Sequence, residues 1–373
     1  MEYLLVGNGI NVEFGGKEYL NPAIINRLVT NLQTKSYSNT FADSISNDEL
    51  LSVVIGLHGE LKNILKGRHD TYCKDKDELA VLNRFKVQYN KGTKIHEIGM
   101  EDFFFILKLF HYKYNDPEEM MKDTFHGLSW ILLDSIYNEG KIQEIHRSIE
   151  QSKVELLRSK IEIFEEIYTV NYDCNLEEIA NRKVHYLHGD FKTLLDQYNP
   201  NTYMGKMMEE IRGQVNPVTS ENSHIYCNAT LGFNGYNKEY IMSIFRNSEY
   251  GIEQLKSKIK SGLTIQEKIK ILLMKNSDDP KQIYAYDMMK TIEKYPYLSH
   301  HIYPSDKFEQ IAGSITIVGM SPNNDEHIWN SILSNEKIDA ITFYYKSKPS
   351  KLWIDEISKV KRINAKPVEE FWN

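Results

Sequence analysis

Small and polar residues gather at four points of the chain, each directly after a short apolar segment. They form the groups Gly7-Asn8-Gly9-Ile10-Asn11, Asn171-Tyr172-Asp173, His188-Gly189-Asp190, and Gly319-Met320-Ser321 followed by Asn323-Asn324-Asp325. Glycines let a backbone approach a ligand closely, while amides, carboxylates and an imidazole can bind hydroxyls and move a proton. These residue types are typical of a site for a phosphorylated, hydroxyl-bearing ligand.

Gly7 and Gly9 end the apolar segment 3–6, and His188 follows the apolar segment 184–187. A Gly-x-Gly turn suits a pyrophosphate, whose anionic oxygens can meet exposed backbone N–H groups. The third glycine of a complete dinucleotide motif is absent, so a simple strand-to-helix turn is the alternative. Histidine can act as a general base near neutral pH, so His188 is a candidate base, the alternative being a structural histidine.

Asn171 and Asp173 flank Tyr172 at the end of the apolar segment 163–170. An amide and a carboxylate together can hold the hydroxyls of a ribose. The alternative is a turn in which the side chain of Asp173 or Asn175 caps the short helix expected at 176–181.

Two other patterns could suggest a serine nucleophile and a metal site, and we expect neither. Gly319-x-Ser321 begins like a nucleophile elbow, but Asn323 stands where the second glycine is required, which disfavours a serine hydrolase. The pair His300-His301 lacks companion ligands at helical spacing, so we expect a loop and no metal site there. Asn323 and Asp325 are expected to cap the next helix and are also candidates for ligand contact.

The segments that must position these residues have the pattern of buried parallel strands. Continuous apolar runs stopped by glycine, as at 3–6 and 314–318, are typical of strands covered on both faces. Ligand sites of open parallel sheets lie outside the carboxyl ends of the strands, so we expect the four groups to converge there. The predicted fold class is α/β, with a Rossmann-like parallel sheet core, large helical insertions and no zinc module.

The helical segments divide the predicted core into three parts. We assign 1–40, 159–236 and 301–373 to the Rossmann-like core, 41–158 to a helical insertion and 237–300 to a second helical segment.

Two helices of the insertion are singled out by their composition. One long charged helix is expected from Lys141 to Ile161. The aromatic segment Phe103–Phe110 is expected to be a core helix, the alternative being a contact surface for a partner.

The composition fits a soluble globular protein of 373 residues, 41% of them hydrophobic and 26% charged. The formal net charge of −7 argues against direct nucleic-acid binding.

No apolar run approaches the roughly 18 residues of a membrane span, and the first residues lack the basic start of a signal peptide. Cys73, Cys174 and Cys227 form no C-x-x-C pair, which disfavours disulfides and a cysteine zinc site. A cytoplasmic protein is therefore expected.

The four groups, in this order, resemble the motifs of the sirtuin-like (silent-information-regulator-type) NAD-binding domain, above all its divergent branch in bacterial antiphage defence. The family's Gly-Ala-Gly-x-Ser loop is matched by 7–11, its Thr-x-Asn-Tyr-Asp element by 169–173 and its Leu-His-Gly element by 187–189. Its late Gly-x-Ser element with a following Asp is matched by Gly319, Ser321 and Asp325. The first loop is also similar to that of AbiH-type abortive-infection proteins. Asn8 and Asn11 depart from the family's Ala and Ser, and the four-cysteine zinc module of the protein-deacylating sirtuins is missing.

The resemblance implies an NAD+ glycohydrolase that cleaves the nicotinamide–ribose bond, with NAD+ as substrate and no metal. Asn171 would position water or ribose hydroxyls, His188 would act as base, and Asp173 would hold ribose hydroxyls or offset positive charge. The resemblance assigns NAD+ binding to Gly7, Asn8, Gly9, Asn11, Tyr172, Gly189, Gly319, Ser321, Asn323 and Asp325. The first four of these would hold the diphosphate, and Ser321 and Asp325 would lie on the adenosine side.

The resemblance further implies an effector that depletes NAD+ during phage infection and is silent before it. A homo-oligomer is expected, with a HerA-like hexameric ATPase or another phage-sensing protein as possible partner. The missing zinc module favours hydrolysis over protein deacylation. An NAD-dependent protein deacylase and a non-catalytic sensor of NAD or ADP-ribose are the alternatives, the sensor being stabilised by its ligand without forming product.

Overall fold

A computed structural model gives the arrangement of the chain. The structure describes residues 1–35, 37, 45–193, 209–211, 214–216, 222–231, 256–277, 303–321, 325–346 and 363–373, with positions 282, 286, 289, 290 and 293. The predicted site residue Asn323 and the pair His300-His301 lie outside the described residues.

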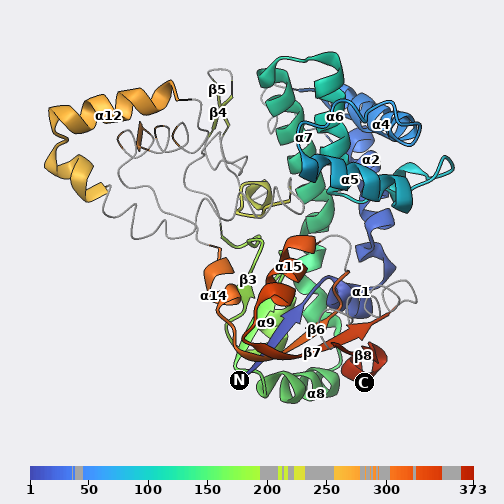
Figure 1. Ribbon diagram of the computed structural model, residues 1–373. Coiled ribbons are helices and arrows are strands. Elements are labelled where there is room, and N and C mark those ends of the chain that lie inside the picture. The colour runs from blue at the N-terminus through green and yellow to red at the C-terminus, as the bar shows by residue number, and fades with distance from the viewer. Residues whose placement is uncertain are drawn as a thin grey trace.

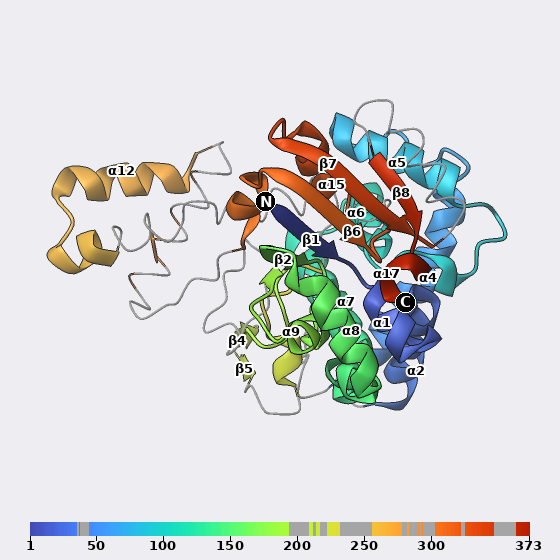
Figure 2. The same cartoon turned by 90° about the horizontal axis from the view of Figure 1, so that it is seen from below.

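Six strands form one parallel sheet in the order β3-β2-β1-β6-β7-β8. Their bounds are β1 Glu2–Val6, β2 Glu166–Thr169, β3 His185–Tyr186, β6 Gly313–Val318, β7 Ile338–Tyr345 and β8 Ile363–Pro367. Figure 2 shows β1 between β2 and β6. In chain order this is the 3-2-1-4-5-6 arrangement of dinucleotide-binding folds, with the winding direction reversing between β1 and β6. The predicted α/β fold with a Rossmann-like core is confirmed.

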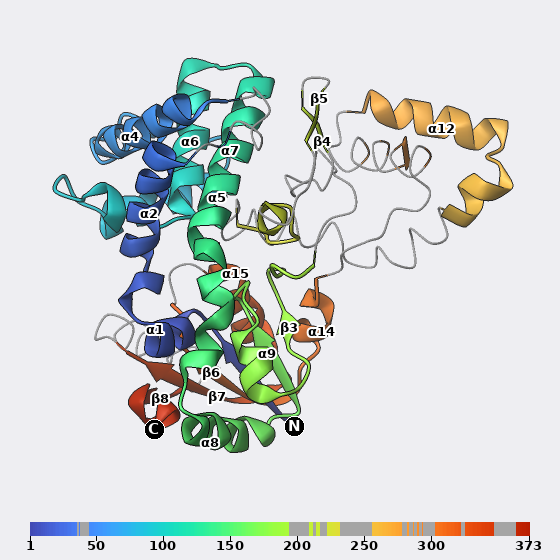
Figure 3. The same ribbon diagram turned by 180° about the vertical axis from the view of Figure 1, so that it is seen from behind.

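Helices cover both faces of the sheet because side chains of a strand alternate between its faces. Tyr3 and Leu5 of β1 share a core with α14 (Ser305–Glu309) and α15 (Glu326–Ser334). Leu4 and Val6 share the opposite core with α1 (Gly9–Gly15), α8 (Gln151–Glu162), α9 (Asn175–Ala180) and α17 (Glu369–Trp372). Figures 1 and 3 show α15 and α8 on opposite sides of the sheet. Burial on both faces explains why β1 is apolar at every inner position.

A layer of helices stands over the carboxyl edge of the sheet (Figure 1). This helical layer consists of α2 (Asn21–Thr34), α4 (Asn47–Ile64), α5 (Lys76–Gln88), α6 (Asp102–Tyr114) and α7 (Glu118–Tyr137). Ser46 and Glu49 form a capping box that starts α4, as their spacing suggests. Phe103, Phe104 and Phe105 of α6 are buried in the core of the layer, so this segment is a core helix and not a partner surface.

The single helix expected from Lys141 to Ile161 is instead two elements, so that prediction was wrong. A 3₁₀ segment, η3 (Asn138–Ser148), precedes α8, and Glu150 between them is extended. Ile142 and Ile145 of η3 are both buried. Their three-residue spacing places them on one side of a 3₁₀ helix, which explains why this conformation suits the segment.

The remaining elements are short. They are the 3₁₀ turns η1 (Lys17–Tyr19), η2 (Ile95–Glu97) and η5 (Ser223–Ile225), the hairpin β4 (Glu209–Ile211) with β5 (Gln214–Asn216), and α12 (Ile265–Lys275). Figure 1 shows α12 far from the sheet. Within the described ranges, no helix combines the length and apolar character needed to cross a membrane. The same part of the chain has no group of three or more His, Cys, Asp or Glu side chains placed to hold a metal ion.

Candidate active site

A cleft of about 430 Å³ opens between the strand ends of the sheet and the helical layer. Its lining contains the predicted site residues Gly7, Asn8, Gly9, Asn11, Asn171, Tyr172, Asp173, His188, Gly319, Ser321 and Asp325. All four sequence groups therefore meet at one place. That place includes the junction of β1 and β6, where the winding direction reverses. Ligand-binding crevices of open α/β sheets occur at such reversals.

Gly7 and Gly9 hold the ends of β1 and β6 in direct backbone contact. The Gly7 N–H donates to the Val318 carbonyl at 2.9 Å, and the Gly9 N–H donates to the Gly319 carbonyl at 2.7 Å. A Cβ atom on Gly9 would lie only 2.3 Å from Cα of Gly319. These two amides are therefore paired within the protein and are not the donors that would meet a phosphate. The glycines instead shape the cleft floor by letting two strand ends touch.

Four amide and carboxylate side chains form a network beside these glycines, in which Asn11, Asp173 and Asn175 are buried and Asn8 is exposed. The Asn11 Nδ2 donates to Asp173 Oδ2 at 2.5 Å and to Asn8 Oδ1 at 3.2 Å. Asn175 donates to Asp173 Oδ1 through its backbone N–H and its Nδ2, at 3.1 and 2.7 Å. Burial raises the pKa of Asp173, and these hydrogen bonds oppose the rise. Asp173 thus forms the turn considered as an alternative, although the N-cap of α9 is Cys174 and no side chain caps the helix. Asp173 also fixes the orientation of Asn11.

Asn171 presents a side-chain oxygen at the end of β2. Its Nδ2 donates to the Gly7 carbonyl at 3.2 Å, and its backbone N–H donates to Thr169 Oγ1 at 3.1 Å. Thr169 Oγ1 in turn donates to the Val6 carbonyl at 2.8 Å. No hydrogen bond from the described part of the chain reaches Asn171 Oδ1. The amide is therefore held by β1 while its acceptor atom is available at a residue that lines the cleft.

His188 is almost fully buried, with 1% of its surface exposed, and it lines the cleft. Its Nε2 lies 3.0 Å from Nε2 of His327 on α15, and its Nδ1 lies 3.8 Å from Oδ1 of Asp325. The second distance is longer than a direct hydrogen bond and fits a bridging water or hydroxyl. Asp325, expected on the adenosine side, lies beside the candidate base.

Gly189 differs from the other predicted residues because it is not part of the cleft lining. Its φ is +80°, and a Cβ would lie 2.2 Å from the Asn228 carbonyl oxygen. The Asn228 side chain accepts from the Asp190 N–H, and the Thr230 N–H donates to the His188 carbonyl. Gly189 therefore lets the segment 222–231 pack against the His188 backbone.

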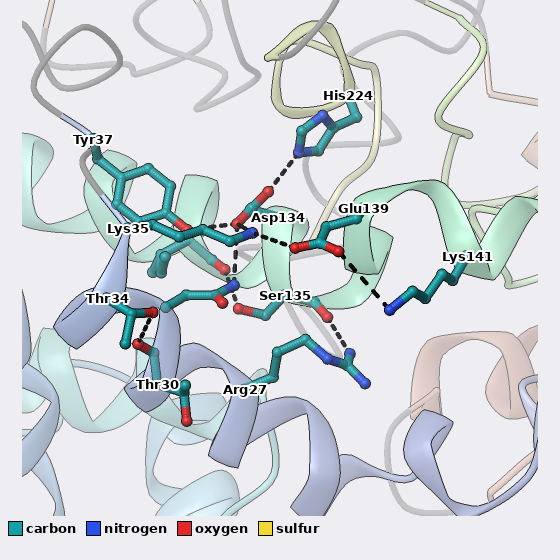
Figure 4. A network of polar contacts seen from close by, with 12 residues as sticks. Arg27, Thr30, Thr34, Lys35, Tyr37, Asp134, Ser135, Glu139, Lys141 and His224 are labelled. Atoms are coloured by element: carbon teal, nitrogen blue, oxygen red, sulfur yellow. Dashed lines mark hydrogen bonds and ion pairs between the residues drawn. The ribbon is translucent and has the colours of Figure 1, made fainter.

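The other end of segment 222–231 is fixed to the helical layer through Asp134 on α7. Figure 4 shows Asp134 among His224, Tyr37 and Lys35. Its carboxylate lies 2.9 Å from His224 Nε2, 2.5 Å from the Tyr37 hydroxyl and 3.3 Å from Lys35 Nζ. Burial alone would raise the pKa of Asp134, but the hydrogen bonds from His224 and Tyr37 and the charge of Lys35 lower it to about 2.

We expect Asp134→Asn to weaken the fold in a pH-dependent way. The folded pKa of about 2 lies below the ordinary 3.8, so the stabilisation is complete above pH 4 and disappears as the pH falls toward 2. A shift of this size corresponds to roughly 2 kcal/mol at neutral pH. Urea unfolding of both proteins at pH 7, 4 and 3 measures the difference, with the exposed Glu162→Gln as control. If Asp134→Asn lowers the free energy of unfolding by the same amount at all three pH values, the ionised Asp134 carboxylate does not stabilise the fold in this way.

Sequence reasoning missed three residues of the site. Lys346 follows β7 and is the only Lys or Arg among the described residues that line the cleft. The rule that polar residues follow sheet strands could have found it. Glu101, just before α6, also lines the cleft, and burial together with the charges of Glu101 and Asp325 raises the pKa of Tyr172. No local signal marks Glu101 or His327, because only the fold brings them to the strand ends.

No protein-family model, curated protein or solved structure matches the chain.

Proposed function

We propose that the protein is an NAD+ glycohydrolase, with NAD+ bound in the cleft as substrate. The observation that carries the proposal is the convergence of residues from the groups at 7–11, 171–173, 188, 319–321 and 325 on the strand-order reversal of a 3-2-1-4-5-6 sheet. The resemblance of the same groups to the sirtuin-like NAD-binding domain supports it independently of the strand order.

The strand order suggests how the substrate lies. His188 follows β3 and Lys346 follows β7, which are four inter-strand spacings apart, or roughly 19 Å at about 4.8 Å each. Asn171, His188 and Asp325 would face the nicotinamide ribose. The positive charge of Lys346 suits the diphosphate. Ser321 follows β6, which lies between β3 and β7, so it would contact the part of the substrate between the nicotinamide ribose and Lys346.

Hydrolysis needs little acid catalysis because the leaving group is already cationic. The bond between ribose C1′ and the pyridinium nitrogen breaks with its electrons passing to nicotinamide, which leaves as a neutral base. Water then bonds to C1′ and gives up one proton. Asn171 Oδ1 would orient that water, and His188 would accept its proton.

The placement of the carboxylates suggests a division of labour between them. Asp325 beside His188 and Glu101 on the opposite wall would offset the positive charge that develops on the ribose. Asp173 would act through Asn11 as a positioning residue, because both of its oxygens accept hydrogen bonds from protein amides. This assignment gives Asp325 the role expected for Asp173 from the sequence and makes Asp173 a positioning residue.

The biological role in this proposal rests on the resemblance to the sirtuin-like defence proteins alone. It makes the chain a cytoplasmic effector of antiphage abortive infection, assembled as a homo-oligomer and controlled by a partner such as a HerA-like hexameric ATPase. Co-purification and mass measurement in solution test the assembly.

We expect the purified protein to release nicotinamide from NAD+, and Asn171→Ala to lower the rate by roughly 100-fold, because the water loses its orienting acceptor. Chromatographic assay of nicotinamide over time measures the rate. Asn26→Ala, on the exposed face of α2, is the matched control and should keep the wild-type rate. Equal rates for wild type and Asn171→Ala would remove Asn171 from the mechanism.

The same assay separates the alternatives. Nicotinamide formed only together with an acylated peptide would indicate a deacylase. Thermal stabilisation by ADP-ribose with no nicotinamide formed would indicate a sensor.

A further inference from the structure

His188 and His327 form a buried pair of imidazoles. Their Nε2 atoms are 3.0 Å apart, their ring centroids are 5.1 Å apart, and both residues are less than 9% exposed. At that distance one nitrogen donates and the other accepts, so the two Nε2 atoms share one proton. Two adjacent imidazolium ions would repel each other, so the pair takes up a second proton with difficulty.

The two histidines line different cavities. His188 lines the cleft, whereas His327 lines a second hollow of about 910 Å³ on the α14–α15 side of the sheet. The hollow is bounded by Leu187, by α14, by α15 and by residues 335–337. Ser305 lines the hollow, and its buried Oγ has no hydrogen-bond partner in the described part of the chain. A water molecule in the hollow would satisfy this hydroxyl. The hollow therefore has both the room and a polar group to hold water.

We infer that His188 and His327 form a proton relay that carries the proton of hydrolysis out of the cleft and into this hollow. The inference rests on the proposed function and adds the route of the proton to it. Each turnover produces one proton, and buried His188 must lose it before the next turnover.

The transfer balances with one proton entering and one leaving. Neutral His188 accepts a proton from the attacking water at Nδ1, the nitrogen nearer Asp325, and becomes an imidazolium. Its Nε2 proton passes to Nε2 of His327, which then releases its Nδ1 proton to water in the hollow. Rotation of both rings restores the starting tautomers without returning a proton to the cleft. His327 thus acts through His188 and does not contact the substrate.

Titratable groups surround the pair on both sides. Asp325 and Tyr172 lie on the cleft side with Glu101 near Tyr172. Around the hollow these groups are Glu309 of α14, Glu336 and Lys337. The segment 222–231 contributes Cys227, and Tyr303 lies behind it, donating to the Asn228 carbonyl.

The test compares His327→Gln and His327→Ala with wild type in the nicotinamide assay from pH 5 to 9. Glutamine can keep a hydrogen bond to His188 but cannot pass a proton. We expect both variants to lose roughly tenfold or more in rate and to show an altered pH profile. Imidazole added to the buffer should restore part of the rate of His327→Ala by entering the hollow. Ser331→Ala, in the same lining, is the matched control and should resemble wild type with and without imidazole.

Full activity of His327→Gln beside an active wild type would overturn the relay and leave the proposed function intact. Activity lost in His327→Ala but retained in His327→Gln would also overturn it, because His327 would then only position His188. Failure of wild type to release nicotinamide would overturn the proposed function and the relay with it. Nitrogen NMR of the imidazoles adds a readout without turnover: the relay requires two coupled titrations in wild type and one in His327→Gln. Independent titrations of the two rings would contradict it.

Discussion

His188→Ala should lower the rate of nicotinamide release by about 1,000-fold, the size of effect typical of a lost general base. Among the described residues that line the cleft, His188 is the only histidine, and its Nε2 contacts His327, which lines the second hollow. The rate in the variant should also lose the pH dependence that the wild type shows, because the proposed base has been removed. Single-turnover measurement of nicotinamide at saturating NAD+ gives this rate directly.

His185→Ala is the matched control for His188→Ala. His185 lies on β3 near His188 but packs against Tyr168 and lies 3.2 Å from Lys307 Nζ, outside the cleft lining. We expect it to keep nearly the wild-type rate. A His188→Ala protein that melts like wild type and still releases nicotinamide at the wild-type rate would exclude His188 as the base.

Gly9→Ala should destabilise the protein by about 3 kcal/mol, because the new methyl group has no room. Its position, 2.3 Å from Gly319 Cα, is occupied by backbone, which cannot rotate away like a side chain. Relief requires separating the ends of β1 and β6, which would break the hydrogen bond from the Gly9 N–H to the Gly319 carbonyl. We therefore expect lower stability and weaker ligand binding together.

Gly59→Ala should have the opposite effect on stability. Gly59 lies exposed in α4, and a Cβ there meets nothing within 4 Å. Alanine in a helix interior should stabilise by roughly 0.5–1 kcal/mol relative to glycine. Urea unfolding midpoints of both variants measure the contrast, and an unchanged midpoint for Gly9→Ala would show that the strand ends are not held in contact.

The sheet could be predicted from the sequence because its strands are buried on both faces. Their apolar runs end in polar groups, and the carboxyl ends of parallel strands share one edge, so convergence of residues 8, 171, 188 and 321 follows from the rule for parallel sheets. The strand order itself does not follow from these runs. The short strand β8, Ile363–Pro367, has no strong apolar run and was not expected.

Contacts between distant segments could not be predicted. Asp134, His224 and His327 are unremarkable in their own segments, and the pairs Asp134–His224 and His188–His327 form only in the folded chain. The role of Gly9 was only partly predicted: close backbone approach was expected, but toward a ligand rather than toward Gly319. Local patterns report burial and turns, whereas pairings across the fold depend on how the helical layer docks on the sheet.

The central claim is that a dinucleotide binds across the strand ends, and hydrogen exchange with and without ADP-ribose tests it most directly. The claim predicts slower amide exchange in peptides covering 8–12, 170–173 and 319–321, with no change in α12. Binding of ADP-ribose without protection at these three strand ends, or no binding at all, would contradict it.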